Sequence, residues 1–156
     1  MLETPHITQT TDQLTAFIHL AVPRREIQKV MGPGINEVME TVAAQGKTPA
    51  GPWFAHHLRM DPAVFEFNIC VPVTTPVVPQ GRVKPGHLAA ATVARTVYRG
   101  PYEGLYGAWS EFDAWVAANR YNPRGDLWEC YVLGPEATAD PANYRTELNR
   151  PLRMPD

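Results

Sequence analysis

The sequence predicts an α+β fold built from two pseudo-symmetric βαββ repeats that form a shared ligand groove. Three observations predict it: alternating apolar residues typical of strands, two stretches with apolar residues at helical spacings of three and four, and the recurrence of this order of elements in the second half. A chain of 156 residues with 44% hydrophobic types is long enough for a single domain. We expect that domain to span residues 1–156, with a first repeat at about 5–75, a linker at 76–87 and a second repeat at about 88–154.

The first repeat is predicted to run strand, helix, strand, strand. The four expected elements are Gln13–Val22, Ile27–Val42, Trp53–Met60 and Val64–Val73. Gly46 is a plausible end for the helix because glycine is common just after helix C-termini. Proline inside a helix costs about 3 kcal/mol. We therefore expect either a kink at Pro33 or a helix that begins near it.

The segment Thr74–Gly86 is rich in proline and glycine and is predicted to be a connector. The same order of elements then returns as Ala90–Tyr98, Leu105–Val116, Asp126–Leu133 and Asn143–Leu152. The separation in sequence is nearly the same for the pairs Val42/Val116 and Trp53/Trp128, and it is slightly longer for the pair Pro72/Pro151. Because this separation changes mainly in one hairpin connection, we interpret the chain as a duplicated unit.

Composition excludes several function classes. The formal net charge of −2 gives no basic cluster for nucleic acid. No apolar run reaches the length of a membrane span, and the N-terminus lacks the order of a signal peptide, so we expect a cytoplasmic protein. Cys70 and Cys130 are expected to be reduced thiols, and adjacent His56 and His57 lack a third ligand, so neither a metal nor a cofactor is predicted. The oligomeric state is left open.

Strand alternation suggests where a ligand would bind. Each unit should bury one face under its own helix, and the second faces should line the groove. Leu127, Glu129, Tyr131 and Leu133 share one face of their strand. If Trp53 is equivalent to Trp128, Phe54 and His56 take the places of Glu129 and Tyr131. The predicted groove is therefore aromatic and centred on Glu129.

A carboxylate among aromatic rings has two chemical uses. It can balance a lipophilic cation that stacks on the rings, or it can act as a general acid or base. Alternatively, Glu129 is a solvated edge residue paired with a basic neighbour such as Arg145, and the pattern does not separate these interpretations. Glu66 could be a second groove carboxylate or an exposed, paired one. The helix aromatics Tyr102, Tyr106 and Trp109 fit either a core or a groove.

Several motifs together resemble a known family. They are Gly51-Pro52-Trp53-Phe54, Glu66 to Val73, Tyr98-Arg99-Gly100-Pro101-Tyr102-Glu103-Gly104-Leu105, Trp128-Glu129-Cys130-Tyr131 and Arg145-Thr146-Glu147-Leu148-Asn149-Arg150-Pro151-Leu152. This set resembles the GyrI-like small-molecule-binding domain, which is the effector-binding module of AraC-type and MerR-type multidrug regulators and also occurs alone as a DNA gyrase inhibitor type. The resemblance covers nearly the whole chain, in order.

The resemblance implies two SH2-like βαββ repeats around a groove whose buried acid binds cationic, aromatic compounds. The acid carries over to Glu129, and the flanking aromatics carry over to Trp53, Phe54, Tyr102, Tyr106, Trp109 and Tyr131. We expect a standalone binding protein for a lipophilic, aromatic small molecule, with cationic compounds among its ligands.

Two alternatives follow from the same resemblance. Some members look like hydrolases of cyclopropane-bearing genotoxic natural products, in which case Glu129 and Tyr131 would be catalytic. A gyrase inhibitor-like role would instead imply DNA gyrase or a regulator as protein partner. The chain departs from the family at His56-His57, where a tyrosine is frequent, and at Leu88-Ala89-Ala90-Ala91, where Leu-Pro-Ala-Gly is frequent.

Overall fold

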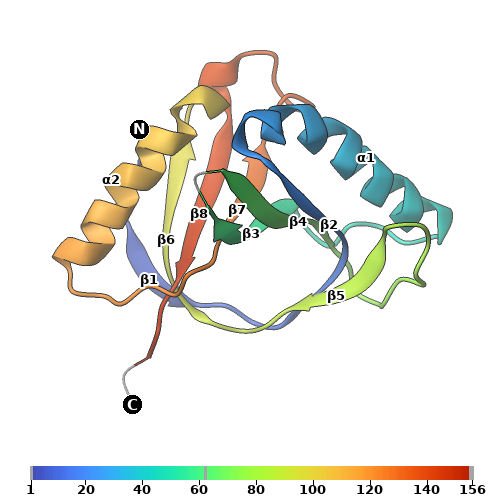
Figure 1. Cartoon of the computed structure of the whole chain (residues 1–156), viewed down its shortest axis with the longest axis horizontal. Helices are drawn as coiled ribbons and strands as arrows, with labels where there is room; N and C mark the ends of the chain where they lie inside the picture. Colours follow the sequence, from blue (N-terminus) through green and yellow to red (C-terminus); the bar gives the residue numbers. More distant parts are fainter. Residues whose placement is uncertain (1, 62, 155–156) are drawn as a thin grey trace. The chain divides into compact units, whose positions relative to one another are not determined.

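The computed structural model describes residues 2–61 and 63–154, and the strand pairs in these residues are antiparallel. The chain divides into two units, one formed by residues 11–90 and the other by residues 1–10 together with 91–156. Each unit has one α-helix and four strands (Figure 1). The predicted α+β class with duplicated βαββ units is confirmed. None of the helices in the described residues combines the length and apolarity needed to cross a membrane.

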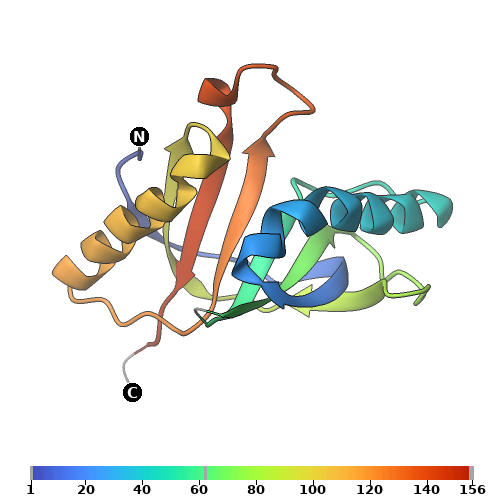
Figure 2. The same cartoon turned by 45° about the horizontal axis from the view of Figure 1, so that its top comes forward.

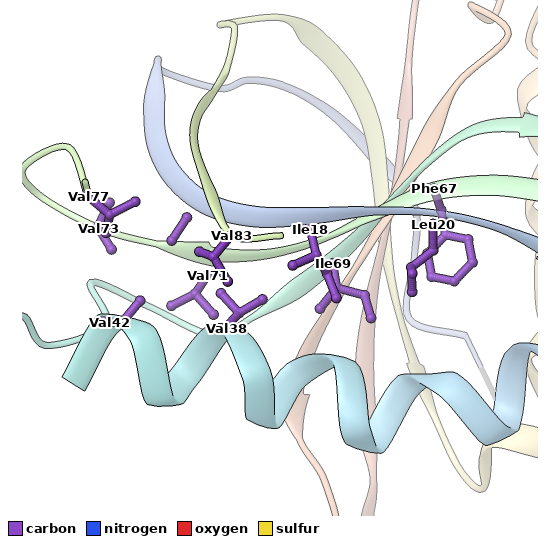
Figure 3. Packing of buried hydrophobic residues seen from close by; sticks show 11 residues of the cluster. Ile18, Leu20, Val38, Val42, Phe67, Ile69, Val71, Val73, Val77 and Val83 are labelled. Atoms are coloured by element: carbon purple, nitrogen blue, oxygen red, sulfur yellow. The ribbon is translucent and has the colours of Figure 1, made fainter. Parts of the chain in front are cut away.

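The unit of residues 11–90 carries its strands in the order β3-β4-β2-β5. Its elements are β2 (Gln13–Pro23), α1 (Ile27–Ala44), β3 (Phe54–Met60), β4 (Val64–Pro72) and β5 (Lys84–Leu88). Val38 and Val42 of α1 point toward the strands and meet Ile18, Ile69 and Val71 (Figure 3). These side chains are almost completely buried, so α1 covers one face of the strands with an apolar core.

The helix α1 begins at Ile27 and continues through Pro33. The prediction that the helix begins near Pro33 is therefore wrong. Gly34 is buried directly after the proline, where an added Cβ would contact the side chains of Ile18 and Ile69. The missing side chain lets the helix backbone approach the strands closely at this turn. Gly46 lies just beyond the helix with φ of +71°, as expected for a terminating glycine.

The other unit carries its strands in the order β1-β6-β8-β7. Its elements are β1 (His6–Gln9), β6 (Thr92–Arg99), α2 (Leu105–Ala118), β7 (Leu127–Leu133) and β8 (Arg145–Pro151). The helix α2, drawn in yellow and orange, runs alongside β6 and β8 in both views (Figures 1 and 2). Ala108, Phe112 and Val116 of α2 pack with Ala94 and Leu148 of the strands beneath it.

Two short edge strands differ from the predicted boundaries. β5 begins within the segment predicted as the linker, 76–87, ends one residue beyond it and pairs with β2. β1 lies at the start of the predicted first repeat but pairs with β6 of the other unit. Both strands are short, and β5 contains Pro85 and Gly86, which edge strands tolerate and which resemble a connector in sequence. Each βαββ unit thus has a fourth strand. β5, which precedes the second βαββ unit in sequence, joins the first unit, and β1, which precedes the first, joins the second.

Strand register corrects the predicted equivalence between the repeats by one residue. Phe54 pairs with Cys70 in the first repeat, and Trp128 pairs with Asn149 in the second. Cys70 and Asn149 are separated in sequence by the same interval as Pro72 and Pro151, so Phe54 corresponds to Trp128. The register shifts also match, because one follows His57 and the other follows Tyr131.

A one-residue slip moves every side chain of a strand to the other face. Ala55 and His57 therefore stand in the places of Glu129 and Tyr131, and the prediction that Phe54 and His56 do so is wrong. Trp53 and Trp128, which suggested the predicted alignment, are therefore not equivalent: Trp53 lies one residue before Phe54, the true counterpart of Trp128. The duplication itself becomes simpler, because the interval between Val42 and Val116 now holds from the helix through the following strand.

Candidate functional site

Glu129 is buried in the second unit with both carboxylate oxygens hydrogen-bonded. The residue is 8% exposed. The indole Nε1 of Trp109, on α2, donates to Oε1 at 2.6 Å. The hydroxyl of Tyr131, two residues along β7, donates to Oε2 at 2.7 Å. Helix and strand thus each contribute one neutral donor to the carboxylate.

The carboxylate lies on the helix-covered face of its unit. Glu129 pairs with Leu148, which belongs to the core under α2. The expectation that Glu129 lies on the face opposite its helix is therefore wrong, as is the alternative of a solvated edge residue. Pleat alternation correctly groups Glu129 with Tyr131, but it does not say which of the two groups faces the helix.

Three tyrosines extend the site beyond the carboxylate. The Tyr102 ring meets the Tyr131 ring edge-on, with centroids 6.0 Å apart, and lies 5.0 Å from the Tyr144 ring at a tilt of 34°. Burial and the neighbouring Glu129 charge raise the pKa of Tyr131 well above its usual value. Burial, followed by the charges of nearby groups led by Glu136, raises the pKa of Tyr102 to about 12. Both hydroxyls are therefore neutral proton donors near pH 7.

Arg150 also contacts Trp109. Its guanidinium lies over the indole ring, 5.6 Å from the centroid. Its Nη2 donates to both carboxylate oxygens of Asp113, at 3.0 and 2.9 Å, and its Nη1 donates to the backbone oxygen of Asp126. A side chain fixed by these bonds limits the movement of the indole that hydrogen-bonds Glu129.

The charges in this cluster are distributed unevenly. Arg150 is paired with Asp113, whereas Glu129 forms no ion pair with any residue in the ranges 2–61 and 63–154. Buried carboxylates in proteins are usually balanced by a cation or a metal. The described residues also contain no group of three or more His, Cys, Asp or Glu suited to a metal. The arrangement suits either attraction of an external cation or proton transfer through the Glu129–Tyr131 pair.

The structure brings together four of the predicted site residues: Glu129, Tyr131, Tyr102 and Trp109. Tyr106 lies on α2 with 70% of its surface exposed. The remaining candidates belong to the unit of residues 11–90. There Trp53 packs against the apolar core, and the half-exposed Glu66 lies 3.9 Å from His19 Nε2. Phe54 and His56 line a cavity on the face opposite α1.

Three residues of the Glu129 site, Asp113, Arg150 and Tyr144, were not predicted from the sequence. Asp113 lies four residues after Trp109 and therefore on the same side of α2, while Arg150 lies two residues after Leu148 and therefore on the same face of β8. Helical spacing and strand alternation could thus have grouped both with Trp109. Tyr144 precedes β8 in an irregular segment, where neither periodicity applies.

Comparison with known proteins identifies the fold. The family model of the GyrI-like small molecule binding domain matches residues 3–153. The crystal structure of the EcmrR C-terminal domain is 20% identical, with a TM-score of 0.85, and the match covers 97% of this chain and 98% of that domain. Against the EcmrR chain in its DNA complex, this chain spans 58% of the length. A search of curated protein sequences found no match.

Two further solved structures share the fold at lower similarity. SAV2435 bound to tetraphenylphosphonium is 15% identical, with a TM-score of 0.67 and coverage of 97% of this chain and 94% of that one. A hydrolase from Listeria innocua is 11% identical, with a TM-score of 0.64 and coverage of 96% and 91%. The match of the family model over nearly the full length decides the assignment: this chain belongs to the GyrI-like small-molecule-binding domain family.

Proposed function

We propose that this protein binds lipophilic aromatic cations and that Glu129 supplies the counter-charge. The observation that carries the proposal is a buried carboxylate with neutral hydrogen-bond donors and no ion pair in the described residues. A cation that brings its own aromatic surface would balance this charge and stack on the tyrosine rings. Each such ring contributes on the order of 0.5–2 kcal/mol.

The other repeat provides an internal comparison that supports a functional role. In the equivalent positions Glu129 is replaced by Ala55, Trp109 by Ile35 and Arg150 by Val71. These apolar residues form or flank the core under α1. Because the same architecture folds with apolar packing at these positions, the polar cluster is not needed to form the fold, and burying it carries a desolvation cost.

The hydrogen bonds to Glu129 favour a particular kind of cation. Trp109 and Tyr131 each occupy one carboxylate oxygen. The carboxylate then acts mainly through its charge, which suits a delocalised or shielded cation such as a phosphonium or quaternary ammonium. SAV2435, which shares the fold, has been solved with tetraphenylphosphonium bound. The shared groove between the two repeats stays a prediction.

Calorimetric titration with tetraphenylphosphonium tests this function. We expect Glu129→Gln to weaken binding at least tenfold, because removal of a buried counter-charge costs more than about 1.4 kcal/mol. Glu111→Gln removes a charge from an exposed position on α2 and is the matched control. Neutral triphenylphosphine oxide should bind both variants and the wild type alike. Equal affinity of Glu129→Gln and wild type for the cation would contradict the proposal.

A hydrolase is the second candidate, favoured by the 2.7 Å hydrogen bond between the Tyr131 hydroxyl and Glu129. A carboxylate beside a proton donor can take a proton from water while the donor returns one to the product. With a cyclopropane-bearing alkylating compound, water oxygen would bond to one ring carbon as a ring C–C bond breaks, giving a product with one added water. The similarity of fold to the Listeria innocua hydrolase is a second reason to test this candidate.

Mass spectrometry of such a compound after incubation distinguishes the two candidates. The hydrolase requires the product with one added water to accumulate with wild-type protein and to disappear with Glu129→Gln. If the compound binds and is recovered unchanged, the protein is a binding protein for this class.

A further inference from the structure

The unit of residues 11–90 has a cavity on the face opposite α1. Its volume is about 310 Å³, and it is lined by side chains from β2, β3, β4 and β5. Phe17 and Phe54 supply aromatic walls, and Thr15, His56 and Asn68 supply polar groups. Phe54 and Thr15 are each only 3% exposed, although α1, the α-helix that the structure describes in this unit, lies on the other face. The residues that line the cavity include none of the Glu129 cluster.

The equivalent face of the other unit is filled by a bonded group of polar side chains. The register places Arg95 in the position of Phe17, Glu147 in that of Asn68, and Asn149 in that of Cys70. Arg95 Nε donates to Asn149 Oδ1 at 2.8 Å and lies 3.4 Å from Glu147 Oε1. Asn149 Nδ2 also donates to Glu147 Oε1 at 3.2 Å.

In the unit of residues 11–90 this trio is replaced by groups that cannot form the same bonds. Cys70 is smaller than asparagine, and Phe17 and Asn68 carry no charge. Gly86 of β5 adds to the difference, since a Cβ there would lie 2.5 Å from the Phe17 ring and 2.7 Å from Thr15 Oγ1. The position equivalent to Gly86 in β1 is Thr8. The glycine thus allows the Phe17 ring to lie against the backbone and form one wall.

We propose that this cavity is a second binding site, specific for uncharged aromatic molecules of one or two rings. None of the side chains that line it is an Asp, Glu, Lys or Arg. The Asp12 carboxylate beside it is solvent-exposed and lies 3.5 Å from His87 Nε2, so the lining itself offers no buried counter-charge to a cation or an anion. Two phenylalanines provide stacking surfaces, and Thr15 and Asn68 place a hydroxyl and an amide in the lining. The Asn68 Oδ1 lies 2.8 Å from His19 Nδ1, so the amide would meet a ligand through its Nδ2. Small-molecule pockets begin at roughly 300 Å³, so the volume suits a small planar ligand.

Ligand-observed NMR with indole and benzamide tests this site, and benzoate and benzylammonium serve as charged counterparts. We expect saturable binding of the neutral pair and at least tenfold weaker binding of the charged pair. His56→Trp places a larger ring in the cavity and should weaken binding of the neutral probes at least tenfold. His6→Trp, the same substitution at an exposed position of β1, is the control and should retain wild-type affinity.

A second variant installs the side chains of the other unit. Phe17→Arg combined with Asn68→Glu and Cys70→Asn should fill the cavity and abolish binding of indole. If this triple variant does not fold, as judged by its melting curve, His56→Trp alone decides. No saturable binding of either neutral probe to the wild type would overturn the proposal, as would affinities unchanged in His56→Trp. Equal loss of binding in the His6→Trp control would show that the loss does not depend on the cavity and would equally overturn the proposal.

Discussion

The two repeats share one architecture but differ in the polar groups that each face carries. In the unit of residues 11–90 the face under α1 is apolar apart from the buried His57, which stands in the place of Tyr131, and the opposite face contains the cavity beside Phe54. In the other unit the face under α2 contains the buried Glu129, and the opposite face is filled by the trio that includes Arg95. Each repeat therefore shows how the other could have been packed, and the departures from apolar packing mark the candidate sites.

The comparison also shows which buried polar groups are not required for folding. Ala55 is completely buried in the position of Glu129, and Met39 stands in that of Asp113. A buried polar cluster that is absent from one of two equivalent units is not required by strand pairing or helix packing. It persists in the other unit at an energetic cost, which is typical of a functional site.

The largest effect is expected when the carboxylate is moved to the other repeat. Ala55→Glu would bury a charge where Ile35 and Val71 replace Trp109 and Arg150. No indole donor is in reach, and the buried ring of His57, which stands in the place of Tyr131, already stacks on Phe67. We therefore expect a loss of about 3–5 kcal/mol in the free energy of unfolding at pH 7. Chemical denaturation would measure it.

Ala55→Gln is the matched control, because it adds similar volume without a charge. Burial raises the pKa of a carboxyl group, so the difference between the two variants should shrink as the pH falls from 7 toward the ordinary pKa of glutamate and should be absent below it, since protonation removes the charge. If the glutamate variant is as stable as the glutamine variant at pH 7, this position tolerates a carboxylate. The conclusion that a buried carboxylate is costly in this fold would then be wrong.

A smaller effect is expected at the close approach of α1 to the strands. Gly34 corresponds to Ala108 in α2, but a Cβ at Gly34 would overlap Cδ1 of Ile69. Overpacking costs about 1–3 kcal/mol, and the higher helix propensity of alanine returns about 1 kcal/mol. We therefore expect Gly34→Ala to destabilise the protein by about 1 kcal/mol.

Ile69→Val removes the overlapping methyl group and supplies the test of this explanation. In that background Gly34→Ala should be neutral or stabilising, and a double-mutant cycle of melting measurements should give a coupling of about 1 kcal/mol or more. Additive effects of the two substitutions would mean that Gly34 is needed for some other reason.

The smallest effect is expected in the free energy of unfolding at alkaline pH. The pKa of Tyr131 is raised in the folded protein by burial and by Glu129, whereas in the unfolded chain it is about 10. Its contribution to stability is therefore complete below about pH 10 and is lost as the pH rises toward the folded-state pKa, because the unfolded state releases the proton first.

Tyr131→Phe removes this dependence. Between pH 9 and 11 the wild type should lose about 1 kcal/mol more than the variant, as measured by urea denaturation at each pH. Tyr102 titrates in both proteins and serves as the common background. Parallel curves for the two proteins would contradict the assigned burial of the Tyr131 hydroxyl.

The sequence predicted the regular elements well because their signals are local. Alternation located β2, β4, β6 and β8, and helical spacing located α2 and the body of α1. β1 and β5 were missed because a short edge strand is stabilised by the neighbour with which it pairs rather than by its own pattern. Of the two alternatives expected at Pro33, a kink or a helix start, the helix start is wrong because α1 already begins at Ile27 and packs against the strands on both sides of the proline, which overrides the local propensity.

For the candidate site, the sequence by itself determined the chemical types and their grouping along one strand. Glu129 and Tyr131 had to share a face because side chains alternate. Only the tertiary structure decided that this face lies under α2, that Trp109 and Tyr131 bond the carboxylate, and that Ala55 rather than Phe54 is its counterpart. The physical reason is register: it depends on hydrogen bonds between strands far apart in sequence, and a shift of a single residue exchanges the two faces.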